Sequence, residues 1–202
     1  MGHRNAPVGV VLAGGAGRRM GGGKAVVELH GRPLISYPVG VLQAALGTVA
    51  VVAKPASELP PLPGVEIWTE PERPSHPLAG IVHALEGAEG RAVLVAAGDL
   101  PFLTRELVKT VAEAPADGCA AVVPRAGGRL QPLLARYEPQ ALEPLSEALV
   151  LDDRLGSLTR VVAALPPCEL ALDEAEAFFN VNLPEDLLTA TAMMDRIDPS
   201  AR

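Results

Sequence analysis

The chain contains little cysteine and no long apolar run. Only two of its 202 residues are cysteines, and Cys119 and Cys168 give neither a disulfide framework nor the spacing of metal ligands. No apolar stretch approaches the roughly 20 residues of a membrane-spanning helix, and no signal peptide is recognisable ahead of the first expected strand. We therefore expect a soluble, cytoplasmic protein that has no membrane partner.

Basic charge is also scarce. Three lysines and 14 arginines are outnumbered by 24 acidic residues, and the formal net charge is −7. Nucleic-acid-binding proteins normally present a basic patch, whereas the cations of this chain concentrate in one glycine-rich segment. The charge therefore argues against a nucleic-acid partner.

That segment runs from Val8 to Lys24 and reads VGVVLAGGAGRRMGGGK. Its apolar, β-branched start predicts a buried strand. Glycines allow positive φ and bring backbone N–H groups close to a ligand, and consecutive amides of this kind form an anion-binding concavity. Arg18, Arg19 and Lys24 add cations that pair with phosphate oxygens. The segment predicts a polyphosphate site.

Neither common phosphate-loop template fits this segment. The Walker pattern requires glycine where Arg18 stands and a hydroxyl residue where Ala25 stands. The dinucleotide pattern GxGxxG, begun at Gly15 and Gly17, meets Met20 in place of its third glycine. A glycine-rich surface turn with two unrelated arginines is the simpler alternative, which the strand leading into the loop disfavours.

Strand-like and helix-like runs alternate along the chain, which predicts an α/β fold with a mostly parallel central sheet covered on both faces, a three-layer α/β/α arrangement. With 202 residues, 49% of them hydrophobic, the chain suits one core, so we expect a single domain over 1–194 and a frayed tail over 195–202. The expected strands are 8–12, 25–29, 48–53, 65–69, 92–97, 119–123, 130–137 and 169–172, and the expected helices are 34–46, 78–85, 104–113, 139–150, 158–165 and 182–194.

An isolated acid stands at the end of one of these strands. Asp99 follows the apolar run 92–97 and is the only acid between Val93 and Leu103. Ligands of open α/β sheets bind beyond the carboxyl ends of the strands, and a carboxylate there suits a cation ligand or a helix cap. We expect Asp99 to hold Mg²⁺, which also binds a triphosphate. The alternative is a cap of the following helix, for which Thr104 is already a good candidate.

Four segments together resemble the MobA-like molybdenum cofactor guanylyltransferase family. The resemblance spans about residues 7–190 and implies a nucleotidyltransferase with a glycosyltransferase-A-like fold (nucleotide-diphospho-sugar transferase-like, Rossmann-like). The matching segments occur in the family's order: LAGG(x)2RRMGG(x)K over 12–24, PLAG over 77–80, GDLPFL over 98–103 and FNVNLPED over 179–186.

The resemblance also implies roles for individual residues. Arg19 and Lys24 would bind the β- and γ-phosphates, and Asp99 would hold Mg²⁺ with help from Asn182. Arg19, Lys24 and Asp99 are the expected catalytic set. The base and ribose would be bound through backbone atoms of Leu12, Ala13, Gly14 and Gly15.

This chain departs from the family pattern at several positions. Gly23 stands where the family commonly has aspartate, and His76 stands where a glycine usually precedes PLAG. The acidic residue that the family carries upstream of PLAG has its best counterpart in Glu70, with Glu72 behind it. We expect Glu70 to contact the nucleotide.

The reaction implied is transfer of GMP from GTP to the phosphate of molybdopterin, which gives the guanine dinucleotide cofactor and pyrophosphate. LAGG rather than LAAG favours guanine, because Gly14 lacks the methyl group of the LAAG loop and leaves room beside the purine edge. The partners implied are GTP, molybdopterin and, transiently, other cofactor-biosynthesis proteins or molybdoenzymes. Three alternatives stay open: a cytidylyl- or other nucleotidyltransferase, a catalytically weak nucleotide-binding module, and an NAD-dependent oxidoreductase, which Met20 and the early Glu28 disfavour.

Overall fold

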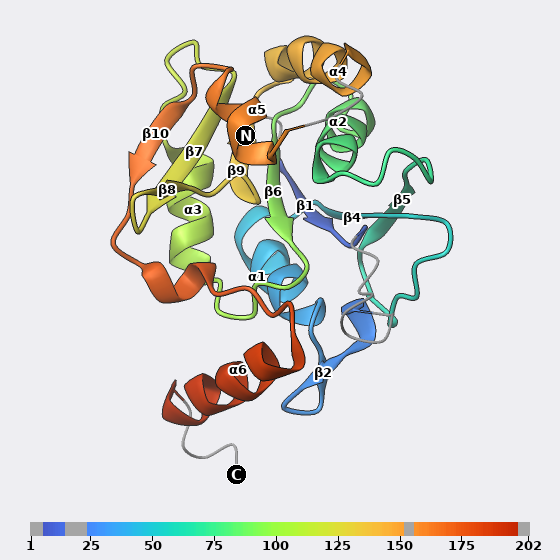
Figure 1. The fold of residues 1–202 in the computed structure, drawn as a ribbon, viewed down its shortest axis with the longest axis vertical. Coiled ribbons are helices and arrows are strands. Elements are labelled where there is room, and N and C mark those ends of the chain that lie inside the picture. Colours follow the sequence, from blue (N-terminus) through green and yellow to red (C-terminus); the bar gives the residue numbers. More distant parts are fainter. Residues whose placement is uncertain (1–5, 15–23, 152–155, 198–202) are drawn as a thin grey trace.

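The fold is known for residues 6–14, 24–151 and 156–197, where a computed structural model places an eight-stranded central sheet (Figure 1). The strand order is β10-β7-β9-β6-β1-β4-β5, and β8 pairs with β7. The strands are β1 (Val8–Leu12), β4 (Val49–Ala53), β5 (Glu66–Thr69), β6 (Val93–Ala97), β7 (Ala121–Ala126), β8 (Arg129–Leu130), β9 (Leu134–Tyr137) and β10 (Cys168–Ala171).

The sheet is mostly parallel, as expected. Strands β5, β4, β1 and β6 run parallel, and β10 is parallel to β7. Strand β9 lies antiparallel between β6 and β7, and β8 is also antiparallel to β7. Parallel strands place their carboxyl ends at one edge of the sheet, where ligands of such folds bind.

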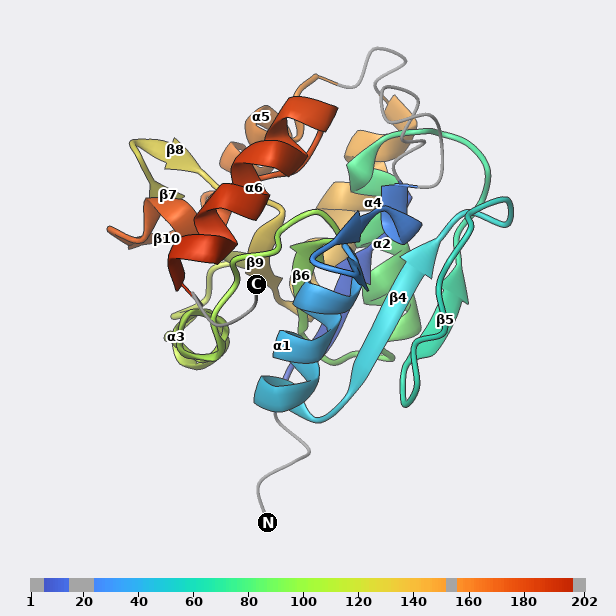
Figure 2. The same ribbon diagram turned by 90° about the horizontal axis from the view of Figure 1, so that it is seen from below.

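Helices cover both faces of the sheet and complete three layers (Figures 1 and 2). Helices α1 (Ser36–Leu46) and α3 (Arg105–Glu113) pack on one face. The other face carries α2 (Pro77–Gly87), α4 (Leu142–Leu151) and α5 (Leu158–Ala163). The predicted three-layer α/β/α architecture is confirmed. No helix in the described ranges is long and apolar enough to cross a membrane.

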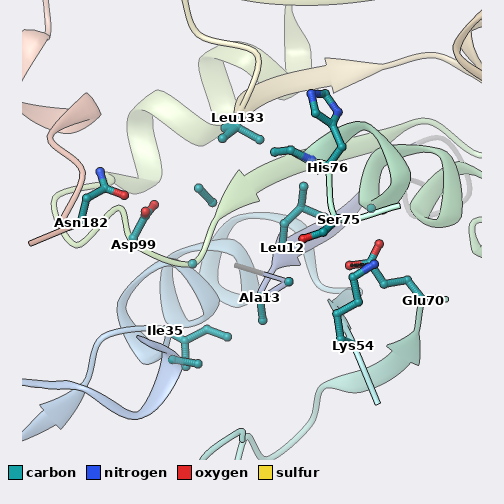
Figure 3. A pocket seen from close by; sticks show the side chains of 16 residues that line it. Leu12, Ala13, Ile35, Lys54, Glu70, Ser75, His76, Asp99, Leu133 and Asn182 are labelled. Atoms are coloured by element: carbon teal, nitrogen blue, oxygen red, sulfur yellow. Dashed lines mark ion pairs between the residues drawn. The ribbon is translucent and has the colours of Figure 1, made fainter. Parts of the chain in front are cut away.

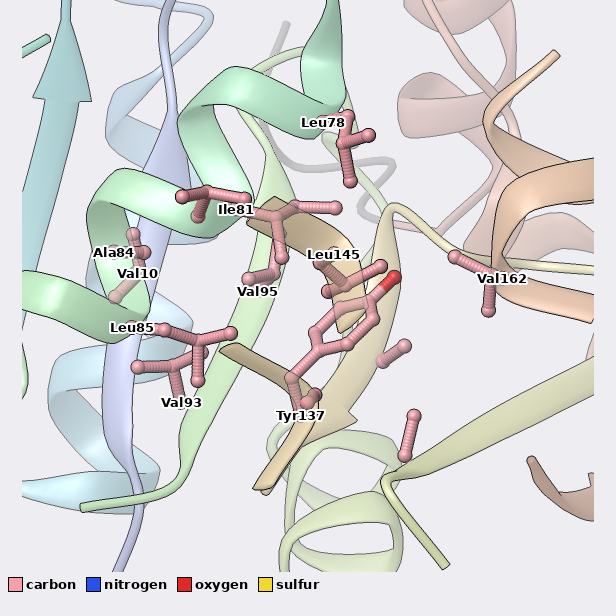
Figure 4. Close-up of a cluster of buried hydrophobic side chains, with 14 of the residues drawn as sticks. Val10, Leu78, Ile81, Ala84, Leu85, Val93, Val95, Tyr137, Leu145 and Val162 are labelled. Atoms are coloured by element: carbon pink, nitrogen blue, oxygen red, sulfur yellow. The ribbon is translucent and has the colours of Figure 1, made fainter. Parts of the chain in front are cut away.

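Strand β6 explains why the central runs are continuously apolar. Val93 and Val95 point into the cluster under α2, whereas Leu94 and Ala96 point into the cluster under α1 and α3. All four are fully buried, because alternate residues of a strand face opposite sides. Figure 4 shows the first cluster, in which Tyr137 from β9 lies among side chains of α2, β6 and α4.

A hairpin and a long helix lie below the sheet in the view of Figure 1. The 3₁₀ helix η2 (Lys24–Val26) leads into β2 (Glu28–Leu29), which pairs with β3 (Arg32–Pro33). Helix α6 (Pro184–Ile197) packs against this hairpin. Two further 3₁₀ helices are η3 (Pro139–Ala141) and η4 (Ala175–Phe178).

Three expectations about the elements are wrong. The strand expected over 25–29 is a 3₁₀ turn followed by two paired residues. The strand expected over 130–137 is interrupted between β8 and β9 at Pro132, which has no N–H to donate to a ladder. Residues 195–197, expected in a frayed tail, are helical because α6 continues to Ile197; residues 198–202 lie outside the described ranges.

The cysteines also differ from expectation, because Cys119 and Cys168 form a disulfide. Cys119 precedes β7, and Cys168 begins β10, its parallel neighbour. The two residues are 49 positions apart, and only the pairing of these strands brings their Cα atoms to 5.7 Å. We refer to this bond below as the β7–β10 disulfide.

Candidate nucleotide-binding site

A pocket lies at the carboxyl ends of β4, β1 and β6, where the start of α2 closes one side (Figure 3). Its volume is about 260 Å³. It is lined by Leu12, Ala13, Gly14, Ala25, Ile35, Lys54, Glu70, Ser75, His76, Pro77, Gly80, Ala97, Gly98, Asp99, Leu133 and Asn182. The pocket therefore brings together all four segments that carry the family resemblance.

The pocket has two polar ends separated by apolar residues (Figure 3). Lys54 and Glu70 lie at one end, and Asp99 and Asn182 lie at the other. The walls between them include Leu12, Ala13, Ile35, Ala97 and Leu133. An elongated ligand with a polar edge at one end and anionic groups near a cation at the other fits this distribution.

Glu70 is the most deeply buried acid of the pocket. The residue is 4% exposed, and its Oε1 lies 3.4 Å from Nζ of Lys54. Its Oε2 is buried and has no hydrogen-bond partner among the described residues. Burial raises the pKa of Glu70, and the nearby Lys54 ammonium offsets part of that rise. A buried acceptor without a partner is costly, so Oε2 is suited to a ligand donor.

Gly14 allows Glu70 to occupy this position. A Cβ added at Gly14 would lie 2.4 Å from Glu70 Oε1, which is closer than real Cβ contacts. The sequence suggested that the missing methyl group leaves room for a purine, but the neighbour in the structure is the carboxylate itself. A glycine at position 14 therefore lets the acid lie against the loop backbone.

Asp99 and Asn182 are brought together by a backbone hydrogen bond. The Val181 N–H donates to the Asp99 carbonyl over 3.0 Å, which draws the chain before α6 towards the end of β6. The Asn182 N–H then donates to Asp186 Oδ2 over 2.8 Å, which fixes the turn that carries Asn182. Thr104 Oγ1 accepts from the Leu107 N–H at the start of α3, so this helix has a cap other than Asp99.

The donor set at this end fits Mg²⁺. Asp99 lines this end of the pocket with a carboxylate and Asn182 with an amide group. The described residues contain no group of three or more His, Cys, Asp or Glu that could hold a metal ion. Mg²⁺ does not need such a cage, because it is usually held by one or two carboxylates, substrate phosphates and water.

Several expected site residues cannot be placed in the pocket. Gly15 and Arg19 lie outside the described ranges. For Lys24 only the backbone is described, as the first residue of η2, whose next residue Ala25 lines the pocket. Of the two acids considered upstream of PLAG, Glu70 lines the pocket, whereas Glu72 is exposed.

Lys54, Ser75 and His76 line the pocket although the sequence patterns do not assign them to it. Lys54 follows the apolar strand β4 as Asp99 follows β6, so the rule that ligands bind at strand ends could have identified it. His76 is the N-cap of α2: its Nδ1 accepts from the Leu78 N–H over 3.1 Å. The imidazole thus supplies a helix cap where the family usually has glycine.

Comparison with known proteins finds relatives that match most of the chain. The family model described as "MobA-like NTP transferase domain" matches residues 9–168. A "Probable molybdenum cofactor guanylyltransferase" of Pelotomaculum thermopropionicum is 36% identical over 194 residues, covering 93% of each chain. The "Molybdenum cofactor guanylyltransferase" of Cereibacter sphaeroides is 31% identical, covering 92% of this chain and 96% of the relative.

Two solved structures have the same fold as this chain. The "Molybdopterin-guanine dinucleotide biosynthesis protein A" of Archaeoglobus fulgidus superposes with a TM-score of 0.72 at 26% identity, covering 94% of this chain and 99% of that one. A 2-C-methyl-D-erythritol 4-phosphate cytidylyltransferase of Thermus thermophilus superposes with a TM-score of 0.68 at 25% identity, covering 93% and 98%. The resemblance noted in the sequence is confirmed, and the chain belongs to the MobA-like NTP transferase family, whose members are nucleotidyltransferases.

Proposed function

We propose that the protein transfers GMP from GTP to the phosphate of molybdopterin, giving the guanine dinucleotide cofactor and pyrophosphate. The observation that carries the proposal is the pocket with Glu70 at one end and Asp99 with Asn182 at the other. The names of the relatives, molybdenum cofactor guanylyltransferases, support the same substrates. A cytoplasmic location and transient contacts with other cofactor-biosynthesis proteins or molybdoenzymes belong to this proposal.

Glu70 is suited to recognise guanine. The Watson–Crick edge of guanine presents two adjacent donors, the N1–H and the 2-amino group, and an ionised carboxylate offers two acceptor oxygens. The corresponding edge of cytosine has one amino donor beside acceptors, which would face the carboxylate unfavourably. A buried acceptor left unpaired by the wrong base rejects that base strongly.

The opposite end is suited to the triphosphate. Asp99 and Asn182 would hold Mg²⁺, which when bound neutralises charge on the phosphates and on the pyrophosphate leaving group. Arg19 and Lys24, on the glycine-rich loop, would bind the β- and γ-phosphates. This arrangement leaves the α-phosphorus between the two ends, where an acceptor phosphate can approach in line.

No general base is needed for this acceptor. The second pKa of a phosphate monoester is about 6, so the attacking group is already largely a dianion at neutral pH. The protein therefore has to offset the repulsion between two anions and to hold them in line. The polar residues of the described pocket are suited to binding and orientation, which is the work this reaction requires.

Equilibrium binding of the four nucleoside triphosphates in the presence of Mg²⁺ tests the base assignment. GTP should bind tightest to the wild-type protein, and Glu70→Gln should remove most of that preference. Glu113→Gln, at an exposed acid on α3, is the matched control and should leave the preference unchanged. Tightest binding of CTP would overturn the guanylyl assignment and favour cytidylyl transfer. Loss of the GTP preference in the control would show that the effect is not specific to Glu70.

A further inference from the structure

Lys54 lies at the same end of the pocket as Glu70 and is partly buried, although no sequence motif includes it. Its side chain is 11% exposed. The Nζ donates to the carbonyl oxygen of Pro71 and, over 3.2 Å, to that of Pro74, and it lies 3.4 Å from Glu70 Oε1. An ammonium group has three donors, and these three acceptors use all of them. Lys54 therefore binds groups of the protein and does not contact a ligand directly.

We infer that Lys54 is a positioning residue for base selection: it fixes the Glu70 carboxylate in the orientation that accepts the two donors of guanine. The inference rests on the proposed function. Oε1 lies beside Lys54 Nζ and occupies the space that a Cβ at position 14 would need, and Oε2 is buried with no partner among the residues the structure describes. Each carboxylate oxygen accepts more than one hydrogen bond, so Oε1 can bind Lys54 and the base together.

The same contact joins two loops of the pocket. Lys54 follows β4, whereas Glu70, Pro71 and Pro74 belong to the loop that follows β5 and leads to α2. The two carbonyl contacts fix the backbone on the carboxyl side of Glu70, and the ion pair fixes its side chain. Removal of the ammonium would release both restraints at once, with β4 and β5 still paired in the sheet.

Lys54 also acts on the protonation of Glu70. Burial raises the pKa of Glu70; the charges of Lys54 and of His83 on α2 lower it, and that of Glu72 raises it. Without Lys54 the buried carboxyl would take up a proton at higher pH. A protonated carboxyl presents an O–H towards the donors of guanine, so the preference for guanine would weaken first at low pH.

The test compares GTP with inosine triphosphate, which differs only by lacking the 2-amino group. Dissociation constants are measured for the full chain with Mg²⁺ in the wild type and in Lys54→Met, which keeps the apolar stem and removes the charge. The wild type should prefer GTP by about tenfold or more, as expected for a charge-assisted hydrogen bond. In Lys54→Met this preference should mostly disappear. As the pH is lowered, GTP binding by Lys54→Met should begin to weaken at a higher pH than GTP binding by the wild type.

Two further variants separate positioning from folding. Lys109→Met, at the lysine of α3, is the matched control and should keep the wild-type ratio. Lys54→Arg keeps the charge and should retain most of the preference; it carries the test if Lys54→Met does not fold. In a Glu70→Gln background, Lys54→Met should change the ratio no further, because both residues act through one carboxylate.

The outcomes separate the positioning role of Lys54 from the proposed function. A wild-type preference for GTP that survives in Lys54→Met, even with a lower melting temperature, overturns the positioning role and leaves the proposed function standing. If Lys54→Met lowers the ratio as much in the Glu70→Gln background as in the wild type, the positioning role is overturned as well. Equal binding of GTP and inosine triphosphate by the wild type overturns the inference alone, whereas tightest binding of CTP overturns the proposed function and the inference with it.

Discussion

Replacing Gly14 by alanine tests how the pocket selects its base. The new Cβ would lie 2.4 Å from Glu70 Oε1, so the carboxylate must retreat by more than half an ångström. The displaced atom is the end of a flexible side chain, and the backbone of Gly14 does not adopt a positive φ. The substitution should therefore cost the fold little, on the order of 1 kcal/mol or less.

The effect on the nucleotide should be much larger. Displacing Glu70 weakens one charge-assisted hydrogen bond to guanine, which is worth about 1.5–3 kcal/mol. At about 1.4 kcal/mol for each factor of ten, kcat/KM for GTP should fall by roughly 10- to 100-fold. CTP makes no matching contact with the carboxylate, so kcat/KM for CTP should change by much less.

The assay is pyrophosphate release with GTP and CTP, alongside thermal unfolding of each variant. Gly40→Ala is the control, because a Cβ added at this exposed position of α1 meets nothing within 4 Å. Adding Glu70→Asp to Gly14→Ala shortens the acid by one methylene and should restore part of the GTP activity. Equal losses with GTP and CTP, or no loss at all, would refute the reasoning.

Four other changes have defined outcomes. Asp99→Ala should lower Mg²⁺-dependent turnover at least about a hundredfold while the melting temperature is kept; near wild-type turnover would contradict the metal role. Arg19→Ala and Lys24→Ala should each weaken triphosphate binding, and strictly additive losses in a double-mutant cycle would show that they share no phosphate site. Burial raises the pKa of Glu70, so proton binding by this carboxyl stabilises the folded protein. This stabilisation is present below about pH 4 and is lost as the pH rises through the pKa of Glu70 in the folded protein. Glu70→Gln should therefore melt progressively higher than the wild type as the pH is raised from 4 to 8, and a constant difference would count against a costly buried carboxylate. Cys168→Ser removes the β7–β10 disulfide, which closes a span of 49 residues, and should lower the free energy of unfolding in urea by about 4 kcal/mol in the chain-entropy description; an unchanged midpoint would show that the bond contributes nothing.

Features that depend only on residues close together in the sequence could be predicted. The apolar runs of β1, β4 and β6 are buried on both faces and specify a parallel sheet almost by themselves. Asp99 was found because it stands alone after such a run, and Thr104 because it is a favourable residue before a helix. Each of these signals lies within a few residues of the feature it predicts.

Features that depend on the partner strand could not be predicted. Cys119 and Cys168 are 49 positions apart, and only the adjacency of β7 and β10 makes them neighbours. The neighbour of Gly14 could not be predicted for the same reason, because the carboxylate beside it belongs to Glu70, which follows β5. Lys54 belongs to no motif, and its three acceptors, Glu70, Pro71 and Pro74, lie 16 to 20 residues further along the chain.

The most direct test of the account is the turnover of each nucleoside triphosphate by the full chain with Mg²⁺, followed as pyrophosphate release with and without molybdopterin. The account predicts release with GTP when molybdopterin is present, and little with any other triphosphate or without the acceptor. Release that is as fast with CTP as with GTP, or that does not depend on molybdopterin, would contradict it.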